Sequence, residues 1–450
     1  MSVVEEKTPT VADESHPPST PKSEDYAPID PAAEKKLLMK LDLCIYPTLF
    51  IIYMMSFLDR INISNARIQG LPQEIDLSGN RFNIALFVYF IPYILLEVPS
   101  NILIRKAGVL PGIIYVTSMY YKRHEFQKRM SFFFTSTLIG GAFGGLLAYG
   151  IARLGGDKGM SAWRWIFIIE GAITAFLSII AVFLIADWPE QARFLTAEEK
   201  TLVQRRLAAD SGDSCRMDTL NKFATERILK DWKIWLGAFM YMGIGTTGYA
   251  GVFFMPTILL EFGWKAEEAQ VQTIPVYVLS AGVMLLSAWG SDRLKHRYGF
   301  VLTGACIATI GYAMLLEQGG KSRDYKFAAV FLINAGGYIA TPICLAWLQN
   351  NLSGHWKRSF GSALQVTLGN VAGIIGANIF LVKESPTYKT GYGTALGMMW
   401  MGTLAATLMF GFMWRENRKR DAGDRDERLS LPEEDLRNMG DWHPSFRFTL

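Results

Sequence analysis

The feature that most constrains this chain is a series of apolar segments, each about as long as a membrane is thick. In the first, Leu41–Ala66, the helix from Lys40 to Asp59 would be about 28 Å long, against a hydrocarbon core of about 30 Å. The other segments lie at 82–104, 131–152, 164–186, 233–254, 274–289, 300–317, 326–348, 360–382 and 394–414. Two of them, 274–289 and 300–317, are short for that thickness. The ten segments predict an all-α polytopic membrane protein.

Composition agrees with this prediction. Of the 450 residues, 50% are hydrophobic and only 19% are charged, which is typical of a membrane protein with polar tails. Residues 1–34 are rich in Pro, Ser, Glu and Lys, and they have no basic start followed by a short apolar region. We therefore expect a disordered cytosolic tail there and no signal peptide.

Long polar stretches divide the rest of the chain. The region 187–232 is a hydrophilic central loop that separates an earlier group of spans, within 35–186, from a later group, within 233–414. A charged run after Trp414 begins a second soluble tail over 415–450. The sequence thus predicts two helical bundles joined by a central loop.

The orientation follows from the basic residues in short loops. Lys35, Lys36 and Lys40 precede the first span, and Arg105-Lys106, Arg293–Arg297 and Arg415–Arg420 fall on the same side. We place that side in the cytosol, together with both termini.

One apolar segment does not fit this scheme. Gly108–Tyr121 has fourteen residues, includes Pro111 and Gly112, and has basic pairs on both sides. It is too short to span, so both of its ends should lie in the cytosol. The expected count is therefore about ten full spans plus one half-helix.

The motifs of common enzymes are missing. The sequence has no Gly-x-Ser-x-Gly elbow, no phosphate-binding glycine loop and no His-Glu-x-x-His helix, and its five histidines all lie in tails or loops. The four cysteines give no disulfide framework. We expect neither an enzyme nor a metal site, and neither a cofactor nor a nucleic-acid partner.

Ionisable residues inside the spans are few, and Asp59 and Arg60 stand out among them. Charges inside the membrane are costly unless they face protein or a water-filled cavity, and they mark ion or substrate pathways. Arg60 can hold a carboxylate through paired hydrogen bonds, and Asp59 can take up a proton. The alternative is that both residues only form the polar outer end of the first span.

Other polar residues in or beside the spans can be explained by structural roles as well as by functional ones. Arg164 and Glu170 can pair with each other and fix the start of their helix, and Asp292 and Arg293 belong to a tight basic turn, Gly290–Arg297. The uncharged polar side chains that can line a central cavity, or simply satisfy backbone groups, are Tyr241, Tyr249, Gln365, Asn370 and Asn378.

Glycines also recur at helical spacing inside the spans. The pairs are Gly140 with Gly144, Gly141 with Gly145, and Gly369 with Gly373. Small residues four apart let two membrane helices approach closely, so we expect tight packing at these positions.

Several longer motifs resemble a known family. Phe57–Ala66 resembles the first helix of the anion:cation symporter family of the major facilitator superfamily, in its fungal allantoate permease-like branch of vitamin-carrier relatives. Similar matches lie at Trp163–Gly171, Phe194–Lys200, Phe254–Leu259 and Gly440–Thr449, and the turn Gly290–Arg297 resembles the loop between helices eight and nine. The resemblance covers about 35–450.

This resemblance implies two six-helix bundles with a site between them. It implies proton-coupled import of a small organic anion, such as allantoate, nicotinate or pantothenate, by alternating access. Asp59 would couple the proton, and Arg60 would be its partner or an anion contact. From their residue types, Tyr249, Gln365 and Asn370 are the candidates to line the site beside them. The expected location is the plasma membrane, and the expected state is a monomer.

The N-terminal bundle departs from the family pattern. A third helix and part of a fourth normally stand between Arg105-Lys106 and Leu110, and that part of the fourth helix carries an arginine and a glutamate near the substrate. Here Gly108–Tyr121 resembles the remaining end of helix four. Either coding sequence has been skipped or this is a variant with an incomplete N-terminal bundle. A non-transporting variant, a sensor and an exporter or drug-type antiporter therefore stay open.

Overall fold

The fold is helical throughout the part of the chain that can be described. The computed structural model describes residues 30–450, apart from 78, 96–116, 118, 156–158, 186–188, 190, 212–225, 227, 354 and 432–438. No strand occurs within these ranges. Nine of the described helices are long and apolar enough to cross a membrane.

The earlier group of helices belongs to the N-terminal half. It contains α1 (Pro31–Ile68), α2 (Leu71–Glu74), α3 (Arg81–Val88), α6 (Arg123–Ala152) and α7 (Ala162–Leu184). Asp30 begins α1, because its side chain accepts hydrogen bonds from the backbone N–H groups of Ala32 (3.0 Å) and Ala33 (3.3 Å), and Pro31 follows at the first helical position.

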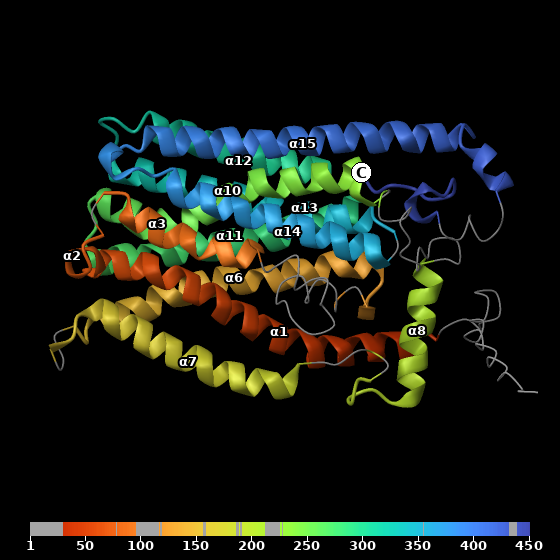
Figure 1. The fold of residues 1–450 in the computed structure, drawn as a ribbon, viewed down its shortest axis with the longest axis horizontal. Helices are drawn as coiled ribbons and strands as arrows, with labels where there is room; N and C mark the ends of the chain where they lie inside the picture. The colour runs from red at the N-terminus through yellow and green to blue at the C-terminus, as the bar shows by residue number, and fades with distance from the viewer. Residues whose placement is uncertain are drawn as a thin grey trace, which may run out of the picture.

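The later group forms a complete second bundle of six helices within the described residues. They are α10 (Trp232–Glu261), α11 (Ala266–Leu294), α12 (Tyr298–Leu316), α13 (Arg323–Asn350), α14 (His355–Asn378) and α15 (Lys389–Asp421). In Figure 1, α1, α6 and α7 lie on one side of the molecule, and α10, α12 and α15 lie on the other. The halves meet where α6 packs on α11, α3 on α14 and α1 on α10.

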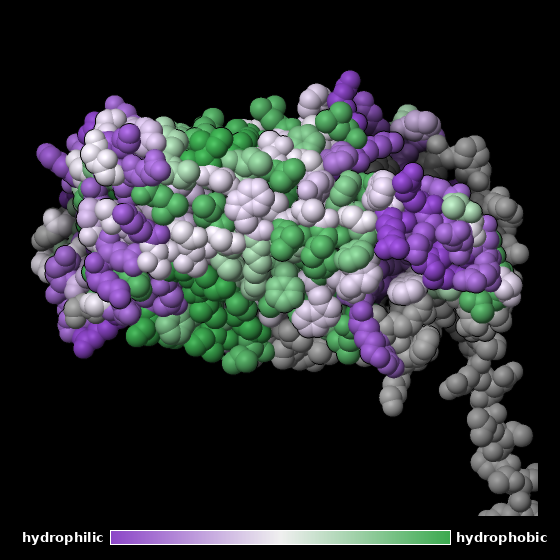
Figure 2. Space-filling view, turned by 90° about the horizontal axis from the view of Figure 1, so that it is seen from above, coloured by the Kyte–Doolittle hydropathy of each residue, from purple (hydrophilic) through white to green (hydrophobic). Residues whose placement is uncertain are grey.

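An apolar band runs around the middle of the molecule. Figure 2 shows this hydrophobic band between two hydrophilic ends on the face it presents. The helix α8 (Ala197–Ser211), from the predicted central loop, crosses one of these ends (Figure 1). Buried Arg206 fastens α8 to the N-terminal half, since its Nε and Nη2 atoms pair with Glu34 and Glu125, both at 2.7 Å.

The structure lengthens several predicted spans, and two predictions fall partly outside the described residues. The span predicted at 274–289 belongs to α11, which has 29 residues and begins at Ala266, with Gln270 buried before the apolar run. The second predicted span, 82–104, is described only as far as Leu95, and most of Gly108–Tyr121 lies outside the described residues.

Five of the six paired glycines pack closely, as predicted from their spacing, whereas Gly144 makes only ordinary contacts at 3.8 Å or more. A Cβ atom at Gly140 would lie 3.1 Å from the Met54 carbonyl oxygen of α1, and one at Gly145 would lie 2.8 Å from the Gln270 carbonyl oxygen of α11. One face of α6 thus packs against α1 of the first half, and the other packs against α11 of the second half. Gly369 likewise accommodates the Tyr241 ring from α10.

Candidate functional site

Arg60 lies where the two halves meet. Its Nη1 atom donates a hydrogen bond to the Tyr249 hydroxyl of α10 at 3.3 Å. That hydroxyl donates in turn to Oδ1 of Asn370 on α14 at 3.1 Å. A continuous series of hydrogen bonds, from Arg60 through Tyr249 to Asn370, therefore joins one helix of the first half to two helices of the second.

Aromatic rings surround the Arg60 guanidinium. Its central carbon lies 5.6 Å from the centre of the Tyr89 ring and 5.3 Å from that of Tyr93, which are cation–π distances. Phe90 contacts the Tyr249 ring edge to face, with 5.3 Å between the ring centres. Among the described residues, no carboxylate forms an ion pair with Arg60, and its buried Nε has no hydrogen-bond partner. A partly buried cation of this kind is suited to bind an anion.

Asp59 points away from this site. It is an exposed residue, and its Oδ1 accepts a hydrogen bond of 3.0 Å from the Thr174 hydroxyl of α7. Adjacent residues on a helix point about 100° apart, so α1 directs Arg60 towards the second bundle and Asp59 towards α7. The two residues do not pair with each other.

Of the five uncharged polar residues, Tyr249 and Asn370 join the site, Gln365 and Asn378 do not, and the Tyr241 ring packs against Gly369. Tyr249 and Asn370 contact the Arg60 chain directly. Gln365 is fully buried inside the second bundle, where its Nε2 donates to the carbonyl oxygens of Gly237 and Cys344, both at 3.2 Å. Asn378 donates to the Ile374 carbonyl of its own helix at 2.8 Å. The side chains of Gln365 and Asn378 therefore bond to backbone carbonyl groups, which is the second of the two roles considered from the sequence.

The predicted pairing of Arg164 with Glu170 is wrong. Arg164 Nη2 pairs instead with Glu74 Oε2 of α2 at 3.0 Å, while Glu170 is buried beside Asn62 of α1. The physical reason is the helical repeat: residues six positions apart point about 120° away from each other. Arg164 therefore faces the polar end of the molecule while Glu170 faces α1.

Asp292 and Arg293 lie in the last turn of α11, at the predicted cytosolic end. Asp292 Oδ1 is 3.6 Å from Arg297 Nη2, and the Arg293 guanidinium lies 5.6 Å from the Trp289 ring centre. Lys295 ends α11 in the left-handed conformation, with φ of 51°. The contacts of both residues are local, with Arg297 and Trp289, and none of these contacts joins them to Arg60.

A second layer of contacts between the halves was not predicted from the sequence. At the end of α1 beyond Arg60, Gln69 Nε2 donates to Gln270 Oε1 at 3.3 Å, and Asn83 Nδ2 donates to the Phe380 carbonyl oxygen at 3.3 Å. Arg67 lies over the Phe82 ring, 4.3 Å from its centre. These residues stand at span ends, where polar side chains normally indicate loops, so only their contacts across the halves identify them. They close the predicted outer end of the interface.

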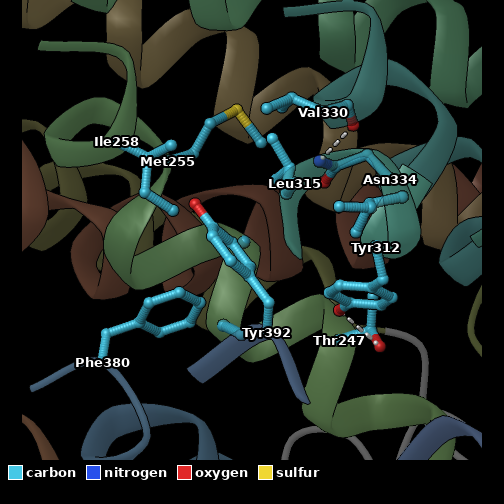
Figure 3. A pocket seen from close by; sticks show the side chains of 12 residues that line it. Thr247, Met255, Ile258, Tyr312, Leu315, Val330, Asn334, Phe380 and Tyr392 are labelled. Carbon is cyan, nitrogen blue, oxygen red and sulfur yellow. Dashed lines mark hydrogen bonds between the residues drawn. The ribbon is translucent and has the colours of Figure 1, made fainter. Parts of the chain in front are cut away.

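A separate cavity lies inside the second bundle, between α10, α12, α13 and α15. Figure 3 shows Tyr392, Tyr312 and Asn334 around it, with the Tyr312 hydroxyl donating to Thr247 at 3.0 Å. At about 30 Å³ it has room for water but not for an organic anion. Within the described ranges, no group of His, Cys, Asp or Glu side chains can hold a metal ion.

Comparison with known proteins decides the family. The sequence profile of the Major Facilitator Superfamily matches residues 104–377, which is more than half of the chain. The chain belongs to this superfamily. An uncharacterized transporter of Schizosaccharomyces pombe is 31% identical over 467 aligned positions, covering 94% of this chain and 91% of that protein. The all-helical, major facilitator-type fold predicted from the sequence is confirmed.

Other relatives of the superfamily carry named activities or known folds. The high-affinity nicotinic acid transporter of Saccharomyces cerevisiae is 27% identical, covering 92% of this chain and 85% of that protein. Among solved structures, a bacterial homologue of the human lysosomal transporter Spinster, in an inward-facing and unoccupied conformation, has a TM-score of 0.52 and 14% identity. It covers 85% of this chain and 97% of its own. That likeness shows the fold alone.

Proposed function

We propose that this protein is a secondary transporter that imports a small organic anion together with protons. The observation that carries the proposal is Arg60, a cation between the two halves that has no carboxylate partner among the described residues. A guanidinium matches a carboxylate with two parallel hydrogen bonds, which favours a monocarboxylate over a neutral molecule. The similarity to a nicotinic acid transporter supports the same substrate class.

The contacts at the predicted outer end suggest how access alternates. The hydrogen bonds from Arg60 to Asn370 and the contact of Gln69 with Gln270 join the halves on the side that the sequence predicts to face outward. Outward opening would break these contacts, while the anion would replace Tyr249 as the hydrogen-bond acceptor of Arg60. We place the protein in the plasma membrane as a monomer, with the lipid bilayer around its apolar band.

The expectation of an incomplete N-terminal bundle also belongs to this proposal. Because 94% of 450 residues is about 423, the alignment of 467 positions with the S. pombe relative leaves about 44 positions that have no counterpart here. This number supports a missing helix and a half. Sequencing the transcript across the codons for Arg105 to Leu110 tests whether the gap is real.

Uptake by purified protein in liposomes tests the function. We expect radiolabelled nicotinate to accumulate under an inward proton gradient, whereas uncharged nicotinamide should not, because the two probes share a ring and differ in the carboxylate. Arg60→Ala should raise the apparent KM at least tenfold, and Arg60→Lys should rescue it only in part because it cannot bind a carboxylate in the same two-point manner. No accumulation of nicotinate, allantoate or pantothenate by the wild type would favour a non-transporting variant. Accumulation driven by an outward gradient would favour an antiporter.

A further inference from the structure

Glu170 is an ionisable residue that the Arg60 site does not use. It lies in the apolar helix α7 with 1% of its surface exposed, and neither carboxylate oxygen makes a hydrogen bond of normal geometry within the described residues. The side chain of Asn62 on α1 lies beside it. An ionised carboxylate that is buried without a cation is costly, whereas its protonated form is neutral and can donate a hydrogen bond.

A second carboxylate lies on the same strip between α1 and α7. Thr174 follows Glu170 by one helical turn on α7 and donates to Asp59 Oδ1 on α1 at 3.0 Å. Asp59 is exposed, whereas Glu170 is buried. Each helix therefore contributes one carboxylate and one neutral polar side chain to the strip.

The cations near this strip are engaged elsewhere. Arg60 points to Tyr249, and Arg164 pairs with Glu74. The neighbouring part of α6 presents Gly144 to α1, and its Ala148 and Ile151 form an apolar cluster with Ile166 of α7. Among the described residues, no cation lies between the two carboxylates, and such a pair in a low-dielectric site favours retention of a proton.

We propose that Glu170 is the proton-binding residue that couples transport, and that it exchanges its proton with water through Asp59. This inference rests on the proposed function, and it moves the buried proton site from Asp59 to α7. One O–H bond forms on the Glu170 carboxylate when the proton binds, and the same bond breaks when the proton leaves. Because Asp59, Arg60 and Asn62 share α1, a movement of this helix affects the proton strip and the anion site together.

Glu170→Gln tests the inference, because glutamine keeps the size and polarity of the side chain but cannot carry the proton. We expect nicotinate accumulation under a proton gradient to fall at least tenfold, while nicotinate exchange at equal pH stays within about twofold of the wild type. Glu170→Asp should keep part of the gradient-driven uptake. Glu74→Gln is the matched control, because it makes the same chemical change in a partly exposed pair and should leave both assays unchanged.

The outcomes separate the inference from the proposed function. A wild type that does not accumulate an anion contradicts the proposed function, whatever the variants do. A wild type that accumulates nicotinate, with Glu170→Gln equal to it at every pH, overturns the inference. Loss of exchange in both Glu170→Gln and Glu170→Asp overturns it too, because the residue would then be structural. Infrared difference spectra give a readout independent of transport: the carbonyl band of a protonated carboxylic acid should disappear in Glu170→Gln, and its persistence contradicts the proposal.

Discussion

Lys357 on α14 and Asp441 near the C-terminus form a buried ion pair, with 2.6 Å between Nζ and Oδ1. Lys233 at the start of α10 lies 2.7 Å from the other carboxylate oxygen, and Asp231 pairs with both lysines. All four side chains are buried. A segment that the sequence alone assigns to a soluble tail thus holds two helices of the second bundle together.

More of the C-terminal segment is fixed to the same end of the bundle. The Thr449 backbone N–H donates to Asn351 Oδ1 at 2.8 Å, and the Thr449 carbonyl accepts from Trp347 Nε1 at 2.8 Å. Arg420 on α15 donates to the Phe446 carbonyl at 2.6 Å. Residues 440–450 therefore belong to the folded core of the second half.

Asp441→Asn should destabilise the protein by about 3–5 kcal/mol, because it leaves two buried lysines sharing one remaining carboxylate. The measurement is the thermal unfolding temperature of the purified protein in detergent. Asp421→Asn is the matched control, since Asp421 pairs with Arg447 at the surface and its loss should cost less than about 1 kcal/mol. Equal unfolding temperatures for the two variants would contradict the structural role of Asp441.

The same cluster predicts a loss of stability in acid. Burial by itself would raise the pKa of Asp441, but the ammonium groups of Lys233 and Lys357 outweigh it and hold the pKa well below its usual value. Because the pKa of Asp441 is lower in the folded than in the unfolded protein, its ionised form stabilises the fold at pH values above the unfolded pKa of about 3.9. This stabilisation is lost as the pH falls towards the folded pKa. Unfolding temperatures should therefore fall more steeply below about pH 4 in the wild type than in Asp441→Asn. Parallel curves would refute this.

Gly145→Leu should block transport. A Cβ atom at this position would lie 2.8 Å from both the Gln270 carbonyl oxygen and the Thr273 hydroxyl, so a larger side chain forces α6 away from α11. Gly150→Leu on the same helix is the control, because nothing lies within 4 Å of the corresponding Cβ. We expect uptake to fall at least tenfold in the first variant only. Similar uptake by both variants would show that this contact does not matter.

A short thiol-specific cross-linker between cysteines at positions 69 and 270 should hold the outer end closed. The two glutamine side chains are hydrogen-bonded at 3.3 Å across the halves, so the double variant Gln69→Cys/Gln270→Cys brings two thiols within reach. With a reducible cross-linker, uptake should stop on treatment and return on reduction. Each single variant serves as a control and should be unaffected. Full uptake by the cross-linked protein would mean that this end does not open.

Part of the site could be predicted from residue types alone. Arg60 stands out because an arginine inside an apolar span is rare, and the glycine pairs stand out because their spacing equals the helical repeat. Gln69 and Gln270 do not stand out in this way. A glutamine at the end of a span gives the same sequence pattern whether its amide is hydrated or bonded to another amide. Glu170 was assigned a partner by proximity in sequence, and the structure gives that partner to Glu74.

The sequence by itself determined the helical class, nine of the ten predicted spans within the described residues, and the presence of two adjacent charged residues in the first span, because apolar length and helical period are local properties of the chain. Only the tertiary structure decided that Arg60 meets Tyr249 while Asp59 meets Thr174, and that Asp441 completes the second bundle. The physical reason is that a buried polar group takes whichever partner the packing brings within about 3 Å, and these partners come from distant parts of the chain.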